Sequence, residues 1–282
     1  SEEGDNLLLK GSGFEIKWNM KRGNPTSIKY KNKEMLSQNS EMPLSLTTQA
    51  FRAPVDNDRG FGKWLAADWD KHNMHSPEVV VESASWKQSD DGSVIISVLS
   101  RNNYLNGSVI TNSEYQVMGD GSIKVDASFN PEGELPELAR LGVVLILSEG
   151  MEDYAWYGRG PHENYPDRKA STSMNLWRSN VTSQFVDYPF PQENGNKEDV
   201  YFLTLTDSRN NGIKIDALDN PFSASALHYL ATDLHEAKHN TILSIDSQML
   251  GLGNSSCGPG VLKCYSIEKK EHKLSFIIRR SK

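Results

Sequence analysis

The sequence predicts an all-β domain built as a large antiparallel sandwich of two sheets. Short segments in which apolar and polar residues alternate recur along the 282 residues, and this pattern is typical of half-buried strands. Glycine-containing turns at Asp91-Gly92, Asn106-Gly107 and Asp120-Gly121 separate several of them, which indicates β-hairpins. Only Trp64–His72 and Asp233–His239 have helical character. Many short strands with one or two short helices favour a sandwich over an α/β fold.

The first half of the chain contains eight predicted strands. They are Phe14–Trp18, Ser27–Tyr30, Leu44–Phe51, Val79–Ser85, Ser93–Arg101, Ser108–Met118, Ser122–Asn130 and Arg140–Ser148. The last of these is apolar nearly throughout, so we expect it to be a central strand buried on both faces. The second half contains six more: Tyr201–Asp207, Gly212–Ala217, Phe222–Tyr229, Thr241–Gln248, Val261–Ile267 and Lys273–Arg279.

Composition excludes several classes of partner and site. The net charge of −7 disfavours nucleic acid and anionic membranes as partners, and no apolar run approaches the roughly 20 residues that a membrane span needs. Two cysteines, Cys257 and Cys264, are too few for a disulfide framework or a four-ligand zinc site, and we expect a free, partly buried thiol pair. The chain begins at Ser1 without Met, and we interpret residues 1–282 as one domain excised from a larger protein.

The segment Tyr154–Ser173 is the one around which we expect the chain to be organised. Its glycines and prolines predict a turn-rich loop, and it carries many aromatic and charged side chains. Such a loop either presents a binding surface or locks a corner of the domain through ion pairs. Both interpretations remain open at this point.

A second loop, Phe51–Lys63, combines a proline with two glycines. We expect Arg52, Asp56 and Asp58 to hold its root and Arg59–Lys63 to form a tip that changes conformation. The alternative is that this segment is an ordinary surface turn whose charged side chains are solvated.

Two patterns resemble metal sites. The oxygen-bearing run Asp56–Asp58 could bind Ca²⁺ or Mg²⁺, but the flanking arginines can neutralise its carboxylates. The run HEAKH at His235–His239 has the spacing of a zinc protease motif. The predicted helix there has barely two turns, so we do not expect a zinc site.

Four motifs in the expected order identify a family. Gly158–Arg168 (GRGPHENYPDR) resembles the GxGPxENYPDR signature of the C-terminal, small-chain domain of glycoside hydrolase family 2 β-galactosidases. Phe51–Gly60 resembles the family's RAPxDND element, Pro189–Gly195 its PQENG element, and Ile245–Pro259 its glycine-rich stretch ending in SWGP. Cys257 departs from the tryptophan of that last element. An aromatic wall residue of the best-known members aligns near Leu218 or Asp219, so a stacking platform is not expected.

The resemblance implies a large two-sheet antiparallel supersandwich of the galactose mutarotase-like type. It also implies an accessory domain of a retaining β-galactosidase, which hydrolyses terminal β-D-galactosides. The domain would border the active site without carrying the catalytic glutamates, which lie in a preceding (β/α)₈ barrel of such enzymes. We therefore expect Glu163 and Glu193 to be structural anchors, with Arg159 or Arg168 as partners, and the isolated chain to be inactive.

The resemblance also names partners and candidate site residues. The partners are the preceding barrel and sandwich domains and the galactoside substrate, and the parent could be a homo-oligomer. We expect no cofactor or metal in this domain, although divalent or monovalent cations could act in the full enzyme. For the parent, a periplasmic or extracytoplasmic location is favoured slightly over the cytoplasm. The candidate residues at the substrate edge or in the motifs are Arg52, Asp56, Asp58, Arg59, Gly60, Arg159, His162, Glu163, Asn164, Arg168, Glu193 and Asn194.

Two other functions remain open. A free-standing carbohydrate-binding or mutarotase-like epimerase domain would use the concave face of one sheet, and an epimerase would need an acid–base pair drawn from residues such as His162, His228 and Glu193. A purely structural or oligomerisation domain would need no cleft at all.

Overall fold

Nine antiparallel strands form the larger layer of the protein. The computed structural model describes residues 1–60 and 65–281, with 49% of residues in strands and 6% in helices. The strand order is β13-β12-β15-β16-β19-β10-β9-β8-β7. The bounds are β7 Glu78–Gln88, β8 Val94–Tyr104, β9 Gly107–Val117, β10 Ile123–Gly133, β12 Asp153–Gly160, β13 Ser173–Asn180, β15 Phe202–Thr206, β16 Gly212–Ala217 and β19 His272–Arg280.

The meander β7–β10 forms where the sequence predicts it. The turn residues Gly92, Asn106 and Gly121 all have positive φ, at 83°, 65° and 82°, which is the conformation that tight hairpins require. The hairpin β15–β16 is also confirmed, with Phe202 opposite Asp216 and Thr206 opposite Gly212.

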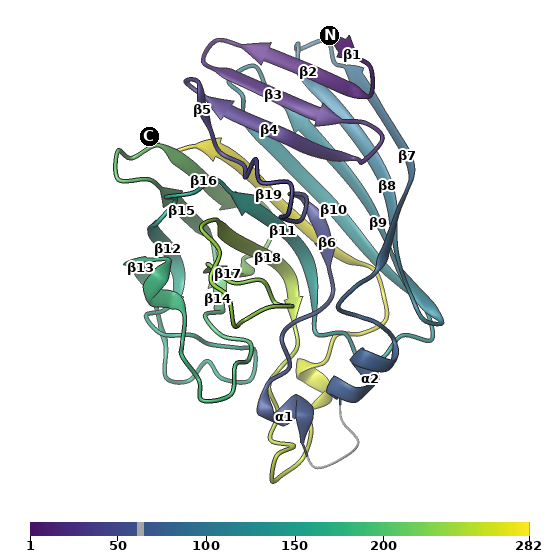
Figure 1. The fold of residues 1–282 in the computed structure, drawn as a ribbon, viewed down its shortest axis with the longest axis vertical. Coiled ribbons are helices and arrows are strands. Elements are labelled where there is room, and N and C mark those ends of the chain that lie inside the picture. Colours follow the sequence, from purple (N-terminus) through teal and green to yellow (C-terminus); the bar gives the residue numbers. More distant parts are fainter. Residues whose placement is uncertain (61–64, 282) are drawn as a thin grey trace.

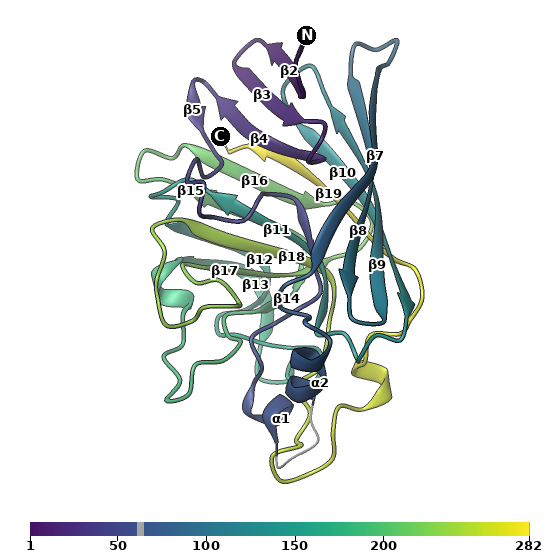
Figure 2. The same cartoon turned by 45° about the vertical axis from the view of Figure 1, so that its right-hand side comes forward.

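The second layer consists of two five-stranded sheets joined side by side. One contains β1 Glu2–Glu3, β2 Asn6–Gly11, β3 Phe14–Asn19, β4 Asn24–Tyr30 and β5 Lys33–Glu34. The other has the order β14-β17-β18-β11-β6, with bounds Lys197–Val200, Phe222–Leu227, Thr241–Met249, Arg140–Leu147 and Thr47–Gln49. A bridge between Leu36 and Leu147 connects them, so the predicted two-layer supersandwich is confirmed (Figures 1 and 2).

One hydrophobic core lies between the layers. The Trp18 ring is 4.5 Å from the Tyr115 ring between centroids, and Phe222 meets Phe276 edge to face at 6.5 Å. Strand β11 is central and buried on both faces, as its apolar run predicts.

Several expected elements are wrong. Residues Asp233–His239 form a loop instead of a helix, because Lys238 bonds both Asp233 and Glu236 and its N–H donates to His228 O. The segment Val261–Ile267 contains only the 3-10 turn η2 (Lys263–Tyr265) and no strand, and β6 is the only part of Leu44–Phe51 that pairs.

The organising segment is shorter than expected, because strands β12 and β13 enclose it. Gly158 and Gly160 lie inside β12, where a Cβ would meet Val200 Cα at 3.0 Å and the Trp177 ring at 2.7 Å. Gly158 therefore permits a close approach of β14 and Gly160 one of the Trp177 ring on β13, and the loop itself covers only residues 161–172.

Four short helical segments complete the fold. They are α1 (Asp56–Arg59), α2 (Leu65–Lys71), η1 (Thr182–Gln184) and η2. The expected helix Trp64–His72 is confirmed over α2, and both α-helices lie at the lower end of the molecule in Figure 1. No helix in the described part of the chain has the length and apolar character to cross a membrane.

Candidate functional site

The four sequence motifs, which span more than 200 residues, meet at the end of the molecule that carries α1 (Figure 1). Residues from all four line one open recess. They are Val55, Asp56, Asn57, Glu163, Tyr165, Tyr188, Gln192, Glu193, Leu252 and Ser256, of which only Tyr188 lies just outside a motif. We call this feature the motif recess.

Arg52 and Asp58 form the root of the segment at α1. Arg52 donates from Nε and Nη2 to the two Asp58 oxygens at 3.1 and 2.8 Å, and both side chains are fully buried. Arg52 also donates to the carbonyl oxygens of Leu250 and Gly251, at 2.7 and 3.1 Å. The Val55 N–H donates to Asp58 Oδ2, so the same carboxylate caps the start of α1. One buried ion pair thus ties the first motif to the fourth.

The outer side of α1 carries Asp56 and Arg59. Asp56 is two-thirds exposed, with an Arg59 contact at 3.7 Å, so it does not share the buried root. Arg59 donates to Pro191 O at 3.1 Å, and its guanidinium lies 4.2 Å from the centre of the Phe190 ring. Gly60 ends α1 with φ at 39°. The rest of the expected tip, residues 61–63, lies outside the described residues.

The oxygen-bearing run Asp56–Asp58 does not form a cation site. Asp58 faces Arg52, whereas Asn57 Oδ1 accepts bonds from the N–H and hydroxyl of Ser256 at 3.1 and 2.7 Å. Within residues 1–60 and 65–281, no group of three or more His, Cys, Asp or Glu side chains is arranged to hold a metal ion.

Glu163 anchors the second motif to the third. It accepts hydrogen bonds from the hydroxyls of Tyr165 and Tyr188 and from the Gly195 N–H, the last at 2.7 Å. The expected arginine partners are wrong. Arg159 pairs with Asp199, and Arg168 donates to Gly253 O and Asn254 Oδ1 at 2.6 and 2.9 Å. Tyrosine hydroxyls satisfy this half-buried carboxylate without a second charge.

Two further motif residues, Asn164 and Asn194, bind backbone N–H groups of neighbouring segments. Asn164 Oδ1 accepts from the Glu198 N–H at 2.9 Å, and Asn194 Oδ1 accepts from the Val186 N–H at 3.1 Å. Both asparagines are buried. His162 is exposed, and its Nε2 lies 3.0 Å from Ser171 Oγ. These asparagines therefore shape the loops, and only His162 among the three is free to meet another molecule.

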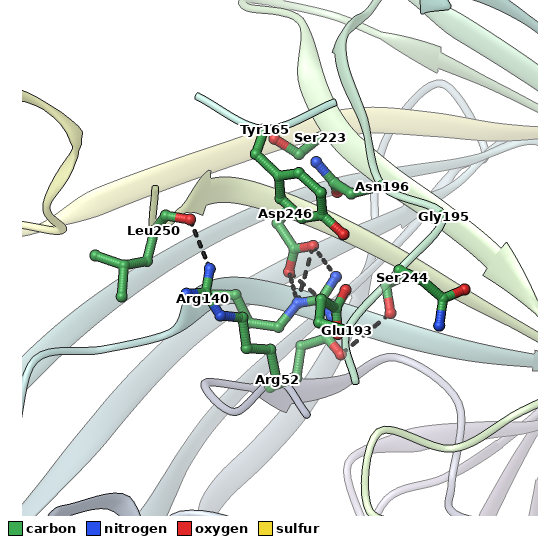
Figure 3. Close-up of polar contacts among 12 residues, drawn as sticks. Arg52, Arg140, Tyr165, Glu193, Gly195, Asn196, Ser223, Ser244, Asp246 and Leu250 are labelled. Carbon is green, nitrogen blue, oxygen red and sulfur yellow. Dashed lines mark hydrogen bonds and ion pairs between the residues drawn. The ribbon is translucent and has the colours of Figure 1, made fainter. Parts of the chain in front are cut away.

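Sequence reasoning missed the charged pair Arg140–Asp246 in the centre of the sheet. Arg140 Nε lies 3.1 Å from both Asp246 oxygens, and Nη1 lies 3.5 Å from Glu193 Oε1 (Figure 3). Gln49 donates to Asp246 Oδ1 at 2.9 Å. The sequence contained a hint of this pair, because Arg140 is the only charged residue of the otherwise apolar β11 and a buried charge needs a partner.

Burial governs the titration of this network. Burial raises the pKa of Glu193 above its ordinary value, against the opposing effect of Arg140 and Arg52. The pKa of Asp246 is also raised by burial, although Arg140 and Gln49 oppose the rise. Burial and the nearby carboxylates of Glu163 and Glu193 raise the pKa of Tyr165, which stays protonated. In this network the carboxyl groups are harder to ionise than they would be in water, because burial disfavours their charged forms.

Comparison with known proteins identifies the chain. The family model described as the beta galactosidase small chain matches residues 10–278. The chain belongs to this family. A β-galactosidase of Lactobacillus delbrueckii subsp. bulgaricus is 29% identical over 284 residues, which cover 97% of the chain and 27% of that enzyme. A β-galactosidase of Kluyveromyces lactis is 27% identical over 287 residues, covering 96% and 26%. This small-chain domain therefore spans about a quarter of the length of these relatives.

Solved structures of other proteins share the fold of the small chain. A candidate aldose 1-epimerase of Escherichia coli K12 superposes with a TM-score of 0.52 and 11% identity, covering 98% of both chains. The galactosidase domain of an α-galactosidase-sucrose kinase also has a TM-score of 0.52, covering 98% of the small chain and 40% of that protein. The galactose mutarotase-like fold class is thereby confirmed.

The cysteines and Leu218 are not among the residues that line the motif recess, although Cys257 directly follows Ser256 of that lining. Cys257 and Cys264 are both free and exposed, so the expected partly buried pair is wrong. Leu218 is 41% exposed and does not line the motif recess.

Proposed function

We propose that this chain is the C-terminal accessory domain of a family 2 retaining β-galactosidase, and that the motif recess faces the active site of the preceding barrel. In this arrangement the barrel supplies the acid and the nucleophile, and the small chain completes the rim. The observation that carries the proposal is the meeting of all four family motifs in one open recess.

The contacts within the motif recess suit a rim better than a catalytic centre. Glu163 accepts three hydrogen bonds, and Glu193 is buried with its Oε1 facing Arg140, so neither carboxylate is placed as a free nucleophile or a solvent-exposed acid. Hydrolysis with retention needs one carboxylate free to attack carbon and another free to transfer a proton. Asp56 is exposed and the half-buried Gln192 bonds it, so these two groups are available only for polar contacts.

The parent supplies the rest of the proposed machinery. Its barrel and sandwich domains are the partners of this chain, and terminal β-D-galactosides are the substrate. We place any catalytic cation in those other domains. Assembly of the parent as a homo-oligomer is part of the same proposal.

A sugar epimerase is the second candidate, because the likeness to the candidate aldose 1-epimerase covers both chains almost completely. The positions of the two candidate histidines, His162 and His228, argue against an epimerase. His228 is held between Asn240 O and Glu152, at 3.0 and 2.8 Å, and His162 contacts Ser171. Neither lies against Glu193 as an acid–base pair requires.

The experiment compares the complete reading frame that contains this chain with residues 1–282 alone. The full protein should release nitrophenol from an aryl β-galactoside, and NMR should show the β-anomer of galactose as the first product. The isolated chain should release none and should not accelerate mutarotation of galactose. An inactive full protein, or activity of the isolated chain that is lost in Glu163→Gln or Glu193→Gln, would show the proposal to be wrong.

A further inference from the structure

The outward face of the β14-β17-β18-β11-β6 sheet carries a second recess, which shares only Glu193 with the motif recess. Along β18, Leu243 and Ile245 point into the core, so Ser244 and Asp246 point outward. Loops cover this face, and a hollow of about 170 Å³ remains between them. We call it the outer-face pocket, and the lining residues used below are Gln49, Phe51, Arg140, Glu193, Ser225 and Tyr229.

The floor of the outer-face pocket is polar and its rim is partly aromatic. The strand register places Ser225 opposite Ser244, and Ser244 opposite Val144, in one row across β17, β18 and β11. Phe51 and Tyr229 stand at the rim, and the Tyr229 ring stacks on Phe185 with 4.0 Å between centroids. A ligand with hydroxyl edges and an apolar face matches such a lining.

Two polar atoms on the wall of the outer-face pocket, Glu193 Oε2 and Ser225 Oγ, have no hydrogen-bond partner among the described residues. Glu193 is 6% exposed, and the one hydrogen bond of its side chain to the described residues is that of Oε1 with Arg140, at a long 3.5 Å. Its Oε2 accepts no hydrogen bond from them. Ser225 is 4% exposed, and its hydroxyl likewise has no hydrogen-bond partner in the described part of the chain. Glu193 and Ser225 line the hollow, so hydroxyl groups of a bound molecule can donate to the Glu193 carboxylate and bond the Ser225 hydroxyl.

The charges around the outer-face pocket select against an anion. Arg140 is matched by Asp246 and Glu193, and Arg52 by Asp58. When all five groups are ionised, the two guanidinium groups and three carboxylates in and behind the wall of the outer-face pocket carry a formal charge of −1. An added anion would be repelled, whereas a neutral molecule with hydroxyl donors would satisfy Glu193.

We propose that the outer-face pocket binds a neutral pyranose sugar. One ring hydroxyl donates to Glu193 Oε2, a second bonds the hydroxyl of Ser225, and the C–H face of the ring lies against the rim formed by Phe51 and Tyr229. This goes beyond the proposed function, because it places a sugar site inside the small chain itself, separate from any barrel.

The binding test uses the 282-residue chain with D-galactose, followed by saturation-transfer NMR and calorimetric titration. A ligand of this size in a partly apolar pocket is expected to bind with a Kd on the order of 1 mM. D-galacturonate, which has the same ring but a negative charge, should bind at least about tenfold more weakly. Absence of saturable galactose binding, or galacturonate binding as tightly, would overturn the assignment.

Two variants and a control locate the site. Ser225→Ala should raise the Kd of galactose about threefold to tenfold while leaving the melting temperature unchanged, because the hydroxyl has no protein partner. Thr232→Trp, at an exposed rim position, should block the outer-face pocket and abolish saturable binding. Ser97→Ala on β8, outside the outer-face pocket, should leave the Kd at its original value.

Galactose binding that survives both Ser225→Ala and Thr232→Trp would refute this site. The result is independent of the proposed function, since binding by the isolated chain is measured without hydrolysis. An inactive parent would refute the proposed function and leave the sugar site intact.

Discussion

Replacing Asp58 with Asn tests the buried root of the segment at α1. Asp58 makes three contacts, two from the Arg52 guanidinium at 2.8 and 3.1 Å and one from the Val55 N–H at 2.9 Å. Both charged side chains are buried, at 0% and 1% exposure. The amide of Asn keeps the shape and one acceptor oxygen, but it leaves the guanidinium without a counter-charge.

The expected cost follows from what Arg52 retains. Breaking a buried ion pair by removing one partner typically costs about 3–5 kcal/mol. Arg52 still donates to the carbonyl oxygens of Leu250 and Gly251, so we expect the lower end, about 3 kcal/mol. For a chain of this size, that loss lowers Tm by roughly 6–12 °C.

The assay is urea unfolding at pH 7 followed by tryptophan fluorescence and circular dichroism, with Asp56→Asn as the matched control. Asp56 lies two positions away and is 66% exposed, so its loss should cost less than about 0.5 kcal/mol. The double variant Arg52→Gln/Asp58→Asn should cost less than the sum of the two single variants, because it leaves no unpaired charge. Equal, small effects of Asp58→Asn and Asp56→Asn would refute the argument.

Three further predictions concern other parts of the fold. Gly142→Ala should lower the free energy of unfolding by about 3 kcal/mol or prevent folding, since the new Cβ would lie 2.1 Å from Ile245 O; a melting curve like that of the wild type would contradict this. Burial lowers the pKa of Lys197 to about 8, so as pH rises the folded state loses this proton at a lower pH than the unfolded state does. The free energy of unfolding therefore increases as pH rises above 8. Between pH 8 and 9.5 the free energy of unfolding of the wild type should therefore rise by about 2 kcal/mol relative to that of Lys197→Met. Urea titrations in which the two proteins keep a constant difference in this free energy over that pH range would contradict the prediction. In the full parent, Gly60→Ala should change kcat and KM together, because Gly60 has φ at 39° at the end of α1; wild-type constants would make the segment a plain connector.

Most of the fold could be predicted from local sequence patterns. Alternation and glycine turns located the meander β7–β10, the hairpin β15–β16 and the buried strand β11, because both features act between neighbours in the chain. The same reasoning failed at β12, where Gly158 and Gly160 resembled turn residues. Their role depends on Val200 and Trp177, which are close only after folding.

The candidate site was predicted in part. The motifs named most residues of the motif recess, and the arginine–aspartate root at Arg52 was anticipated from sequence proximity. Glu163 was expected to pair with an arginine, and it binds two tyrosines instead. A carboxylate does not encode its partner locally, because any nearby donor with the right geometry serves equally well.

By itself, the sequence determined the all-β class, the position of most turns, the family and the residues of the four motifs, since these depend on residue type and spacing alone. Only the tertiary structure decided that the motifs form one recess, that Arg140 pairs with Asp246 across 106 positions of the chain, and that Glu193 and Ser225 line the outer-face pocket. The physical reason is that strand order and register bring such residues together, and neither is written in the alternation of a single strand.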